Sequence, residues 1–127
     1  MPVYNAERYV AEAVESILTQ TFTDFEFLIV DDGSIDDTPE LLRRYEKSDS
    51  RVRLTVRTNL GLVPTLNEML RAARGEFIAR MDADDIALPS RLLSQVAFMR
   101  GHPENRLCGY FLHYDRRHGA TANDGPS

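Results

Sequence analysis

The sequence has a single cysteine, Cys108, and no long apolar run. One cysteine excludes an intrachain disulfide, which fits a reducing compartment, and we therefore expect a cytoplasmic location. No apolar run approaches the roughly 20 residues that a membrane span needs. The N-terminus also lacks the basic-then-apolar layout of a signal peptide. We expect no transmembrane segment, which leaves peripheral membrane contact open.

Positive charge is also scarce, because 15 Lys and Arg residues face 20 Asp and Glu residues and the net charge is −5. Nucleic-acid-binding surfaces normally carry a basic patch, so we expect no nucleic-acid partner. The Gly-x-Gly-x-x-Gly loop of dinucleotide-binding domains is absent. The only lysine, Lys47, falls at the end of a predicted helix. Its position disfavours a Mg-dependent phosphoacceptor signalling domain, which needs a lysine on a late strand.

Helical and strand patterns alternate along the 127 residues, a length that suits one domain. This order is typical of an α/β domain with a Rossmann-like, mainly parallel sheet and flanking helices. The first predicted helix, capped at Asn5, leaves room for a first strand that is missing or very short. We expect the domain to cover 1–118 and a disordered tail to follow over 119–127. Helices are predicted over 5–19, 38–47 and 64–73 and from Pro89 up to Gly101, and strands over 25–30, 51–57, 76–81 and 107–114.

Two acidic clusters directly follow predicted strands: Asp31-Asp32-Gly33-Ser34 and Asp82-Ala83-Asp84-Asp85. Ligands of parallel α/β sheets bind outside the carboxyl ends of the strands. Mg²⁺ and Mn²⁺ prefer oxygen ligands, and a bound cation can in turn hold phosphates. The two clusters together therefore indicate a metal and phosphate site. Each cluster alone is also typical of a solvated turn that caps the next helix.

Four segments in order resemble a family-2 glycosyltransferase of the type-A, nucleotide-sugar-binding fold. The resemblance covers about residues 1–105, and its specificity comes from the order of the four matches. They are Pro2-Val3-Tyr4-Asn5 with Gln20-Thr21-Phe22; the strand at 25–30 with Asp31-Asp32-Gly33-Ser34 and Asp37-Thr38; Asn59-Leu60-Gly61 with Asn67, Ala73 and Gly75-Glu76; and Met81-Asp82-Ala83-Asp84-Asp85 with Pro89 and Arg91-Leu92.

The resemblance implies binding of a UDP- or GDP-type nucleotide sugar and transfer of its sugar, as in polysaccharide biosynthesis. Mn²⁺ or Mg²⁺ would neutralise the leaving diphosphate. Asp84 would be the direct metal ligand, Asp82 would contact the ribose or the metal, and Asp32 would accept a hydrogen bond from the base. Pro2, Tyr4 and Asn67 are implied at the nucleotide, and Asn5, Asp31, Gly33, Ser34 and Asp85 in support of the loops.

For three of these residues, a purely structural role stays open as an alternative. Tyr4 is equally explained as a core tyrosine and Asn67 as a polar residue on a helix surface. Asp85 is equally explained as an acidic residue near the N-terminus of the helix at Pro89.

The sequence departs from the family at both ends. The first strand of the family would precede Pro2. An acceptor-binding half, with the general base of inverting members, would follow the segment seen here. Asp115 and Asp124 lie in the wrong context for that base, so the catalytic residue is unassigned. The resemblance implies a donor-binding part that is truncated at both ends. A non-catalytic remnant or nucleotide-binding module of the same fold is the alternative.

Overall fold

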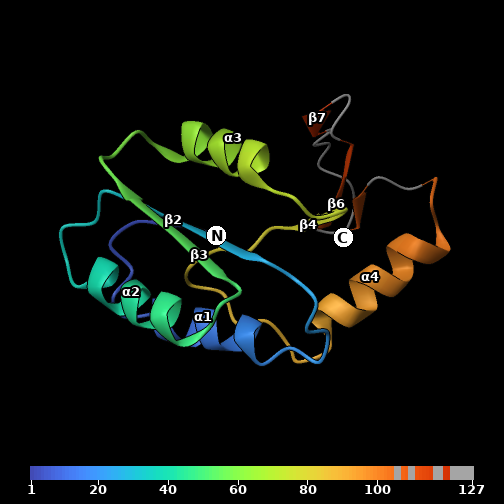
Figure 1. Ribbon diagram of the computed structural model, residues 1–127, viewed down its shortest axis with the longest axis horizontal. Helices are drawn as coiled ribbons and strands as arrows, with labels where there is room; N and C mark the ends of the chain where they lie inside the picture. The colour runs from blue at the N-terminus through green and yellow to red at the C-terminus, as the bar shows by residue number, and fades with distance from the viewer. Residues whose placement is uncertain (105–106, 109–110, 116–118, 121–127) are drawn as a thin grey trace.

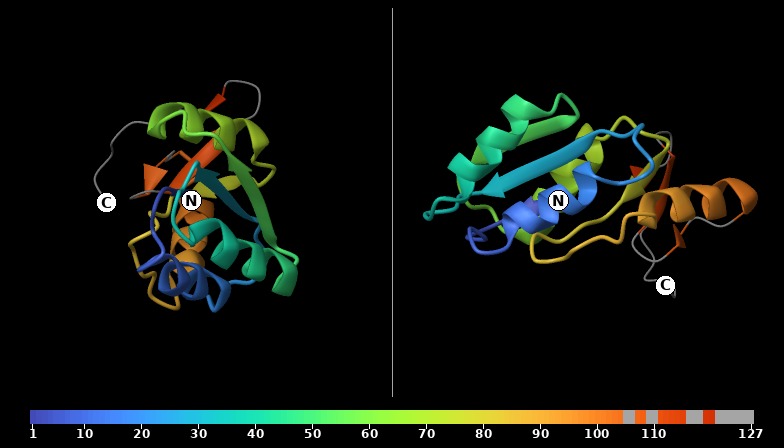
Figure 2. Two further views of the ribbon diagram at one scale, coloured as in Figure 1. Left: turned by 90° about the vertical axis from the view of Figure 1, so that its left-hand side faces the viewer. Right: turned by 90° about the horizontal axis from the view of Figure 1, so that it is seen from below.

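The computed structural model describes residues 1–104, 107–108, 111–115 and 119–120. Three parallel strands form the first sheet, in the order β1-β2-β3. Figures 1 and 2 show two helices, α1 and α2, on one face of this sheet and a third, α3, on the other. The α/β class with flanking helices is confirmed, and the first strand is as short as expected. The bounds are β1 Pro2–Val3, α1 Val10–Leu18, β2 Phe27–Asp32, α2 Thr38–Ser48, β3 Val52–Arg57 and α3 Leu62–Ala72.

The register of the parallel strands brings their carboxyl ends together. Val3 pairs with Asp31, and Asp32 pairs with Arg57. Because parallel neighbours end at the same edge of a sheet, the loops after β2 and β3 lie side by side. The first acidic cluster therefore lies at this edge, next to Arg57 of β3.

The strands after α3 form a second, antiparallel sheet in the order β4-β6-β5, with β7 paired to β6. The strand predicted over 107–114 is divided into two here, and Gly119–Ala120 of the predicted tail forms β7. Residues 121–127 of that tail lie outside the described residues. The bounds are β4 Phe77–Ala79, α4 Arg91–Gly101, β5 Leu107–Cys108, β6 Phe111–Asp115 and β7 Gly119–Ala120.

Helix α1 supplies the centre of the core. Its buried side chains recur at the i, i+3, i+4, i+7 spacing of one helix face. They pack with Val3, Ile29 and Leu42, so α1 is fixed against both the sheet and the neighbouring helix α2. The buried residues of the helix are Val10, Ala13, Val14 and Ile17, each at most 5% exposed.

The predicted cap of this helix is wrong. The helix begins at Val10 with Tyr9 at the N-cap position, whereas Asn5 has a positive φ of 47°. A helix cap has extended backbone, so Asn5 cannot serve as one. Its side chain has a different partner, described below.

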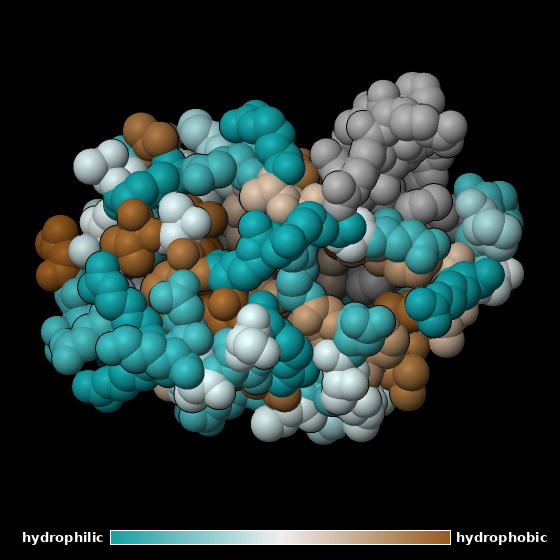
Figure 3. Space-filling view, in the orientation of Figure 1, coloured by the Kyte–Doolittle hydropathy of each residue, from teal (hydrophilic) through white to brown (hydrophobic). Residues whose placement is uncertain are grey.

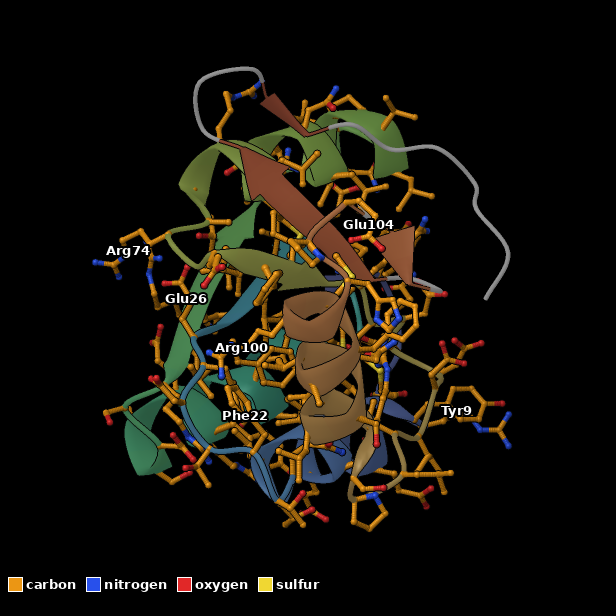
Figure 4. The ribbon with its side chains drawn as sticks, turned by 90° about the vertical axis from the view of Figure 1, so that its right-hand side faces the viewer. Tyr9, Phe22, Glu26, Arg74, Arg100 and Glu104 are labelled. Carbon is orange, nitrogen blue, oxygen red and sulfur yellow. The ribbon has the colours of Figure 1, made fainter. Side chains whose placement is uncertain are left out.

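A cavity of about 570 Å³ separates β4 from the edge of β2. Its lining is mostly apolar and includes Leu28 of β2, Leu66 of α3 and Phe77 of β4. At its rim, Glu26 accepts hydrogen bonds from the Arg74 amide (2.7 Å) and from Arg53 Nη1 (2.7 Å). Figure 4 shows Glu26 and Arg74 at this side of the molecule. These bonds tie the segment after α3 to the segment before β2.

No helix in the described part of the chain is long and apolar enough to cross a membrane.

We expect the ion pair of Asp49 and Arg51 to give the fold a measurable acid dependence. The Arg51 guanidinium donates to Asp49 Oδ1 (3.0 Å) and Oδ2 (2.8 Å) and lowers the pKa of Asp49 to about 2. Because the folded pKa lies below the ordinary value of 3.8, the carboxylate stabilises the fold above that value. This contribution is lost as the pH falls towards 2.

Asp49→Asn should therefore lower the free energy of unfolding at pH 7 by about 1 kcal/mol or less, because a partly exposed pair is screened. The difference from the wild type should vanish near pH 2. Thermal melts of both proteins across this range test the prediction, with the exposed Asp24→Asn as control. A pH-independent difference would contradict it.

Candidate functional site

The loop after β2 is built around two buried aspartates. Asp31 is fully buried, and its Oδ1 accepts hydrogen bonds from the Ser34 hydroxyl and the Ser34 amide. Gly33 has a φ of +79°, and a Cβ there would lie 2.6 Å from the Asn59 nitrogen. Only glycine fits both the left-handed backbone and this close approach. The loop after β2 is therefore packed directly against the loop after β3.

Asp32 joins these two loops. Its Oδ1 accepts from the Leu60 amide (2.8 Å) and its Oδ2 from the Gly61 amide (3.0 Å). Its backbone carbonyl accepts from Asn59 Nδ2 (2.9 Å). Arg57 Nη2 lies 3.7 Å from Oδ1, and the aspartate is only 6% exposed. Asp32 thus presents a buried, fixed carboxylate at the edge of the sheet.

The segment after β1 is bonded to the same loop by reciprocal contacts. The Asn5 amide donates to Ser34 Oγ (2.8 Å), and Asn5 Oδ1 accepts from the Ile35 amide (2.9 Å). The next residue repeats this link, because the Ala6 amide donates to Thr38 Oγ1 (3.0 Å) at the start of α2. Asn5, Gly33 and Ser34 therefore lie together and hold one continuous edge.

The second acidic cluster, residues 82–85, follows β4 and is called the acidic loop below. The Asp85 amide donates to the Asp82 carbonyl (3.1 Å), which closes a turn. Asp84 and Asp85 are exposed, and the Asp82 side chain is 45% exposed. Burial lowers the pKa of the Met1 amino group to about 5, and the Asp82 carboxylate opposes this shift. Met81, next to the acidic loop, lines the same cavity as Met1 and Pro2 and belongs to the same core cluster as Val3. The acidic loop therefore lies near β1, which pairs with the strand that carries Asp31 and Asp32.

Two arginines adjoin the acidic loop. Arg80 Nε lies 3.7 Å from Asp82 Oδ1. Arg91 Nη2 donates to the Arg80 carbonyl (2.7 Å) and Nη1 contacts Met81 Sδ (3.4 Å). Burial lowers the pKa of Arg91, and Asp85 and Asp82 oppose this shift. Arg91 therefore supplies a fixed positive charge beneath the acidic loop and anchors the backbone just before it.

The donor groups of the loop suit a cation that a diphosphate also binds. Within the described residues, no three Asp, Glu, His or Cys side chains come together as a group that could hold an ion. Mg²⁺ is commonly held by one or two carboxylates together with phosphate oxygens and water. Asp82 and Asp84 present two solvent-accessible carboxylates of this kind. The residues thus fit a shared metal and diphosphate site better than a closed structural one.

The three other predicted nucleotide-binding residues are more widely spread. Pro2 pairs with Val30 in the sheet. Tyr4 is 53% exposed, which disfavours the core tyrosine, and Asn67 is exposed on α3. Figure 3 shows hydrophobic side chains at the end of the molecule where Figure 1 has the loops after β2 and β3. The exposed hydrophobic residues of these loops are Ile35 and Leu60.

The model of the family described as Glycosyl transferase family 2 matches residues 1–122. The chain belongs to glycosyl transferase family 2. The putative glycosyltransferase EpsE of Bacillus subtilis (strain 168) is 40% identical over 111 residues, which are 86% of this chain and 40% of EpsE. Chondroitin synthase of Escherichia coli is 40% identical over 89 residues, 70% of this chain and 13% of the synthase.

Solved structures agree with this family 2 assignment. S. aureus TarS 1–349 in complex with UDP-GlcNAc has a TM-score of 0.74 and 32% identity over 80% of this chain and 30% of that chain. The mannosyltransferase PcManGT from Pyrobaculum calidifontis, in complex with GDP-Man and Mn²⁺, has a TM-score of 0.70 and 30% identity over 77% of this chain and 30% of that chain. The family 2 chain described here spans less than half the length of these relatives.

Sequence reasoning assigned no role to two side chains of this family 2 site, Arg57 and Arg91. Arg57 contacts Asp32, donates to the Thr65 hydroxyl and forms an ion pair with Glu68 (3.0 Å). The signal for Arg57 is its place at the last position of a strand that pairs with the strand ending in Asp32. Arg91 belongs to the fourth matching segment, but its bond to the Arg80 carbonyl, 11 residues away across a turn, carried no local signal.

Proposed function

We propose that residues 1–118 form the donor-binding domain of a glycosyltransferase. The domain binds a UDP- or GDP-type nucleotide sugar together with Mn²⁺ or Mg²⁺, for transfer of the sugar to an acceptor. The observation that carries this proposal is that β1 pairs with the strand of the buried aspartates and shares its core cluster with Met81, next to the solvent-accessible acidic loop. A nucleoside and a diphosphate need these two environments side by side.

On the nucleoside side, Asp32 accepts a hydrogen bond from the base, and Tyr4 packs on the base or ribose. Both Asp32 oxygens already accept one backbone amide, and each carboxylate oxygen has a second lone pair for a ligand. The exposed ring of Tyr4 supports a stacking role. Pro2 and Asn67 complete this side, and Asn5, Asp31, Gly33 and Ser34 hold its loop.

On the diphosphate side, Asp84 is the direct metal ligand, and Asp82 contacts the ribose or the metal. The cation, when bound, offsets the negative charge that develops on the leaving diphosphate. Asp85 supports the acidic loop, and Arg91 offsets the repulsion between the Asp82 and Asp85 carboxylates. The solved complexes of TarS with UDP-GlcNAc and of PcManGT with GDP-Man and Mn²⁺ support this class of ligand.

The acceptor and the general base belong to the part of the relatives that this chain does not span. Donor binding is therefore the activity that we propose for residues 1–118. We also place the domain in the cytoplasm, where nucleotide sugars are made available as donors. A non-catalytic nucleotide-binding module of the same fold would give the same binding result.

Calorimetric titration of UDP and GDP, each with and without Mn²⁺, tests the donor site. For one of the two nucleotides we expect Mn²⁺ to raise the affinity by at least about tenfold, or about 1.4 kcal/mol. Uridine and guanosine, which lack phosphates, are the controls and should bind equally with and without Mn²⁺. If neither nucleotide binds under any of these conditions, the proposed donor site is wrong for this chain.

A further inference from the structure

The last turn of α1 and the three residues after it hold the segment that follows the acidic loop. Gln20 is 3% exposed. Its Nε2 donates to the Leu88 carbonyl (2.6 Å), and its Oε1 accepts from the Leu92 amide (3.0 Å). The side chain therefore bonds to both sides of the turn that leads into α4.

Two neighbours of Gln20 add to this contact. The Ala87 amide donates to Ser16 Oγ (3.0 Å), and the Thr21 amide donates to the Pro89 carbonyl (2.9 Å). Gln20 Nε2 also donates to the Ser16 carbonyl (3.0 Å), which fixes the amide against the helix. These bonds, together with those of Gln20 to Leu88 and Leu92, are called the α1 clamp below.

The acidic loop is thus restrained at both of its ends. Before it, Arg91 Nη2 holds the Arg80 carbonyl. After it, the α1 clamp holds the segment 87–92. Arg91 itself is in the first turn of α4. The next residue, Leu92, donates its amide hydrogen bond to Gln20 Oε1. Loss of Gln20 would therefore loosen both restraints together.

The segment that leads into α1 is bonded to the other acidic cluster. The Asn5 and Ala6 amides donate to Ser34 Oγ and Thr38 Oγ1. Between the two ends, α1 spans nine residues, or about 13 Å at 1.5 Å per residue, and one face of it is buried. Because the core holds the helix along its length, α1 bends little and keeps the segments at its two ends at a fixed distance.

We propose that α1 sets the spacing between the two acidic clusters and that Gln20 is the positioning residue for the acidic loop. The functional meaning of this inference rests on the proposed donor site. Gln20 touches neither nucleotide nor metal in this proposal. It fixes where Asp82 and Asp84 stand relative to Asp32, so that one nucleotide diphosphate can reach both.

Two substitutions at Gln20 and one on α2 test this role. Gln20→Met keeps the volume and removes both kinds of hydrogen bond. Gln20→Glu keeps the acceptor for the Leu92 amide and removes the donor to Leu88. The matched control is Tyr45→Phe, which removes the bond from the Tyr45 hydroxyl to Glu15 of α1 (2.8 Å) and touches neither loop.

The first measurement is hydrogen exchange of residues 80–92 without any ligand. We expect Gln20→Met to speed exchange of the Leu92 amide and its segment by about tenfold or more, because buried partners are left unpaired. Gln20→Glu should fall between Gln20→Met and the wild type, and Tyr45→Phe should match the wild type here. Unchanged exchange of this segment in both Gln20 variants would overturn the inference, whatever the nucleotide titrations give.

The second measurement is the gain in UDP or GDP affinity that Mn²⁺ produces, set against the affinity for uridine or guanosine. If Gln20 positions the acidic loop, Gln20→Met should lower the Mn²⁺-dependent gain in nucleotide affinity by about tenfold. The nucleoside affinity of the variant should stay within about threefold of the wild-type value. An equal loss of both would show general destabilisation and overturn the role. If the wild type shows no such gain, the donor site fails, and the exchange result alone decides whether α1 holds the loop.

Discussion

Asp84→Asn should abolish the effect of Mn²⁺ on UDP or GDP binding. The substitution keeps the size of the side chain and removes its negative charge, so a hard cation loses a carboxylate ligand. We expect the affinity in the presence of Mn²⁺ to fall by on the order of 100-fold, or about 2.8 kcal/mol. Affinity for the nucleoside should not change, because Asp84 is exposed and belongs to the acidic loop, not to the loop that holds Asp32. Calorimetry with and without Mn²⁺ measures both quantities.

Asp85→Asn is the matched control for this prediction. It makes the same chemical change at the next position, in an equally exposed carboxylate, and gives the same net charge. We expect a loss of less than about tenfold, because this residue supports the loop beside Arg91. If Asp85→Asn costs as much as Asp84→Asn, the assignment of the direct ligand to Asp84 is wrong. Equal and small losses of affinity in both variants would show that the acidic loop is not part of the metal site.

The positions of the acidic residues at strand ends could be predicted because their signals are local. Each cluster lies at or shortly after the end of an apolar strand, and the carboxyl ends of parallel strands define one edge of a sheet. The register of β1, β2 and β3 confirms the edge that this pattern predicts for Asp31 and Asp32. The helix periodicity of α1 predicted its buried face for the same reason, since residues 10, 13, 14 and 17 repeat within one short segment.

The contacts that hold the site could not be predicted, because they join residues far apart in the chain. Gln20 and Leu92 are separated by 72 positions, and Asp32 and Leu60 by 28. The error at Asn5 has the same origin. An asparagine before an apolar helix favours a helix cap. In the structure, however, the Asn5 side chain accepts a hydrogen bond from the Ile35 amide, 30 residues on, and the Asn5 backbone is left-handed. The antiparallel pairing of β4 with β6 likewise depends on residues that follow the predicted metal loop.

Asp32 illustrates how one residue carries both a predicted and an unpredicted role. The resemblance implies contact with the base, whereas the structure also makes Asp32 the joint between two loops. Asp32→Ala would leave the Leu60 and Gly61 amides without an acceptor and the Arg57 guanidinium, only 14% exposed, without this carboxylate. We expect the free energy of unfolding to fall by about 3–5 kcal/mol, because buried charged and polar groups lose their partner. Thermal or urea unfolding measures this loss.

Asp37→Ala is the control for Asp32→Ala, since it removes an exposed carboxylate from the same loop that makes no capping bond to α2. Its effect should stay within about 0.5 kcal/mol. Asp32→Asn separates the two roles of Asp32, because one amide oxygen can still accept a backbone amide. It should recover part of the stability, while nucleotide binding stays weakened by the lost charge. A stable Asp32→Ala protein would show that Arg57 and the loop amides find other partners, and Asp32 would then keep only its proposed role at the base.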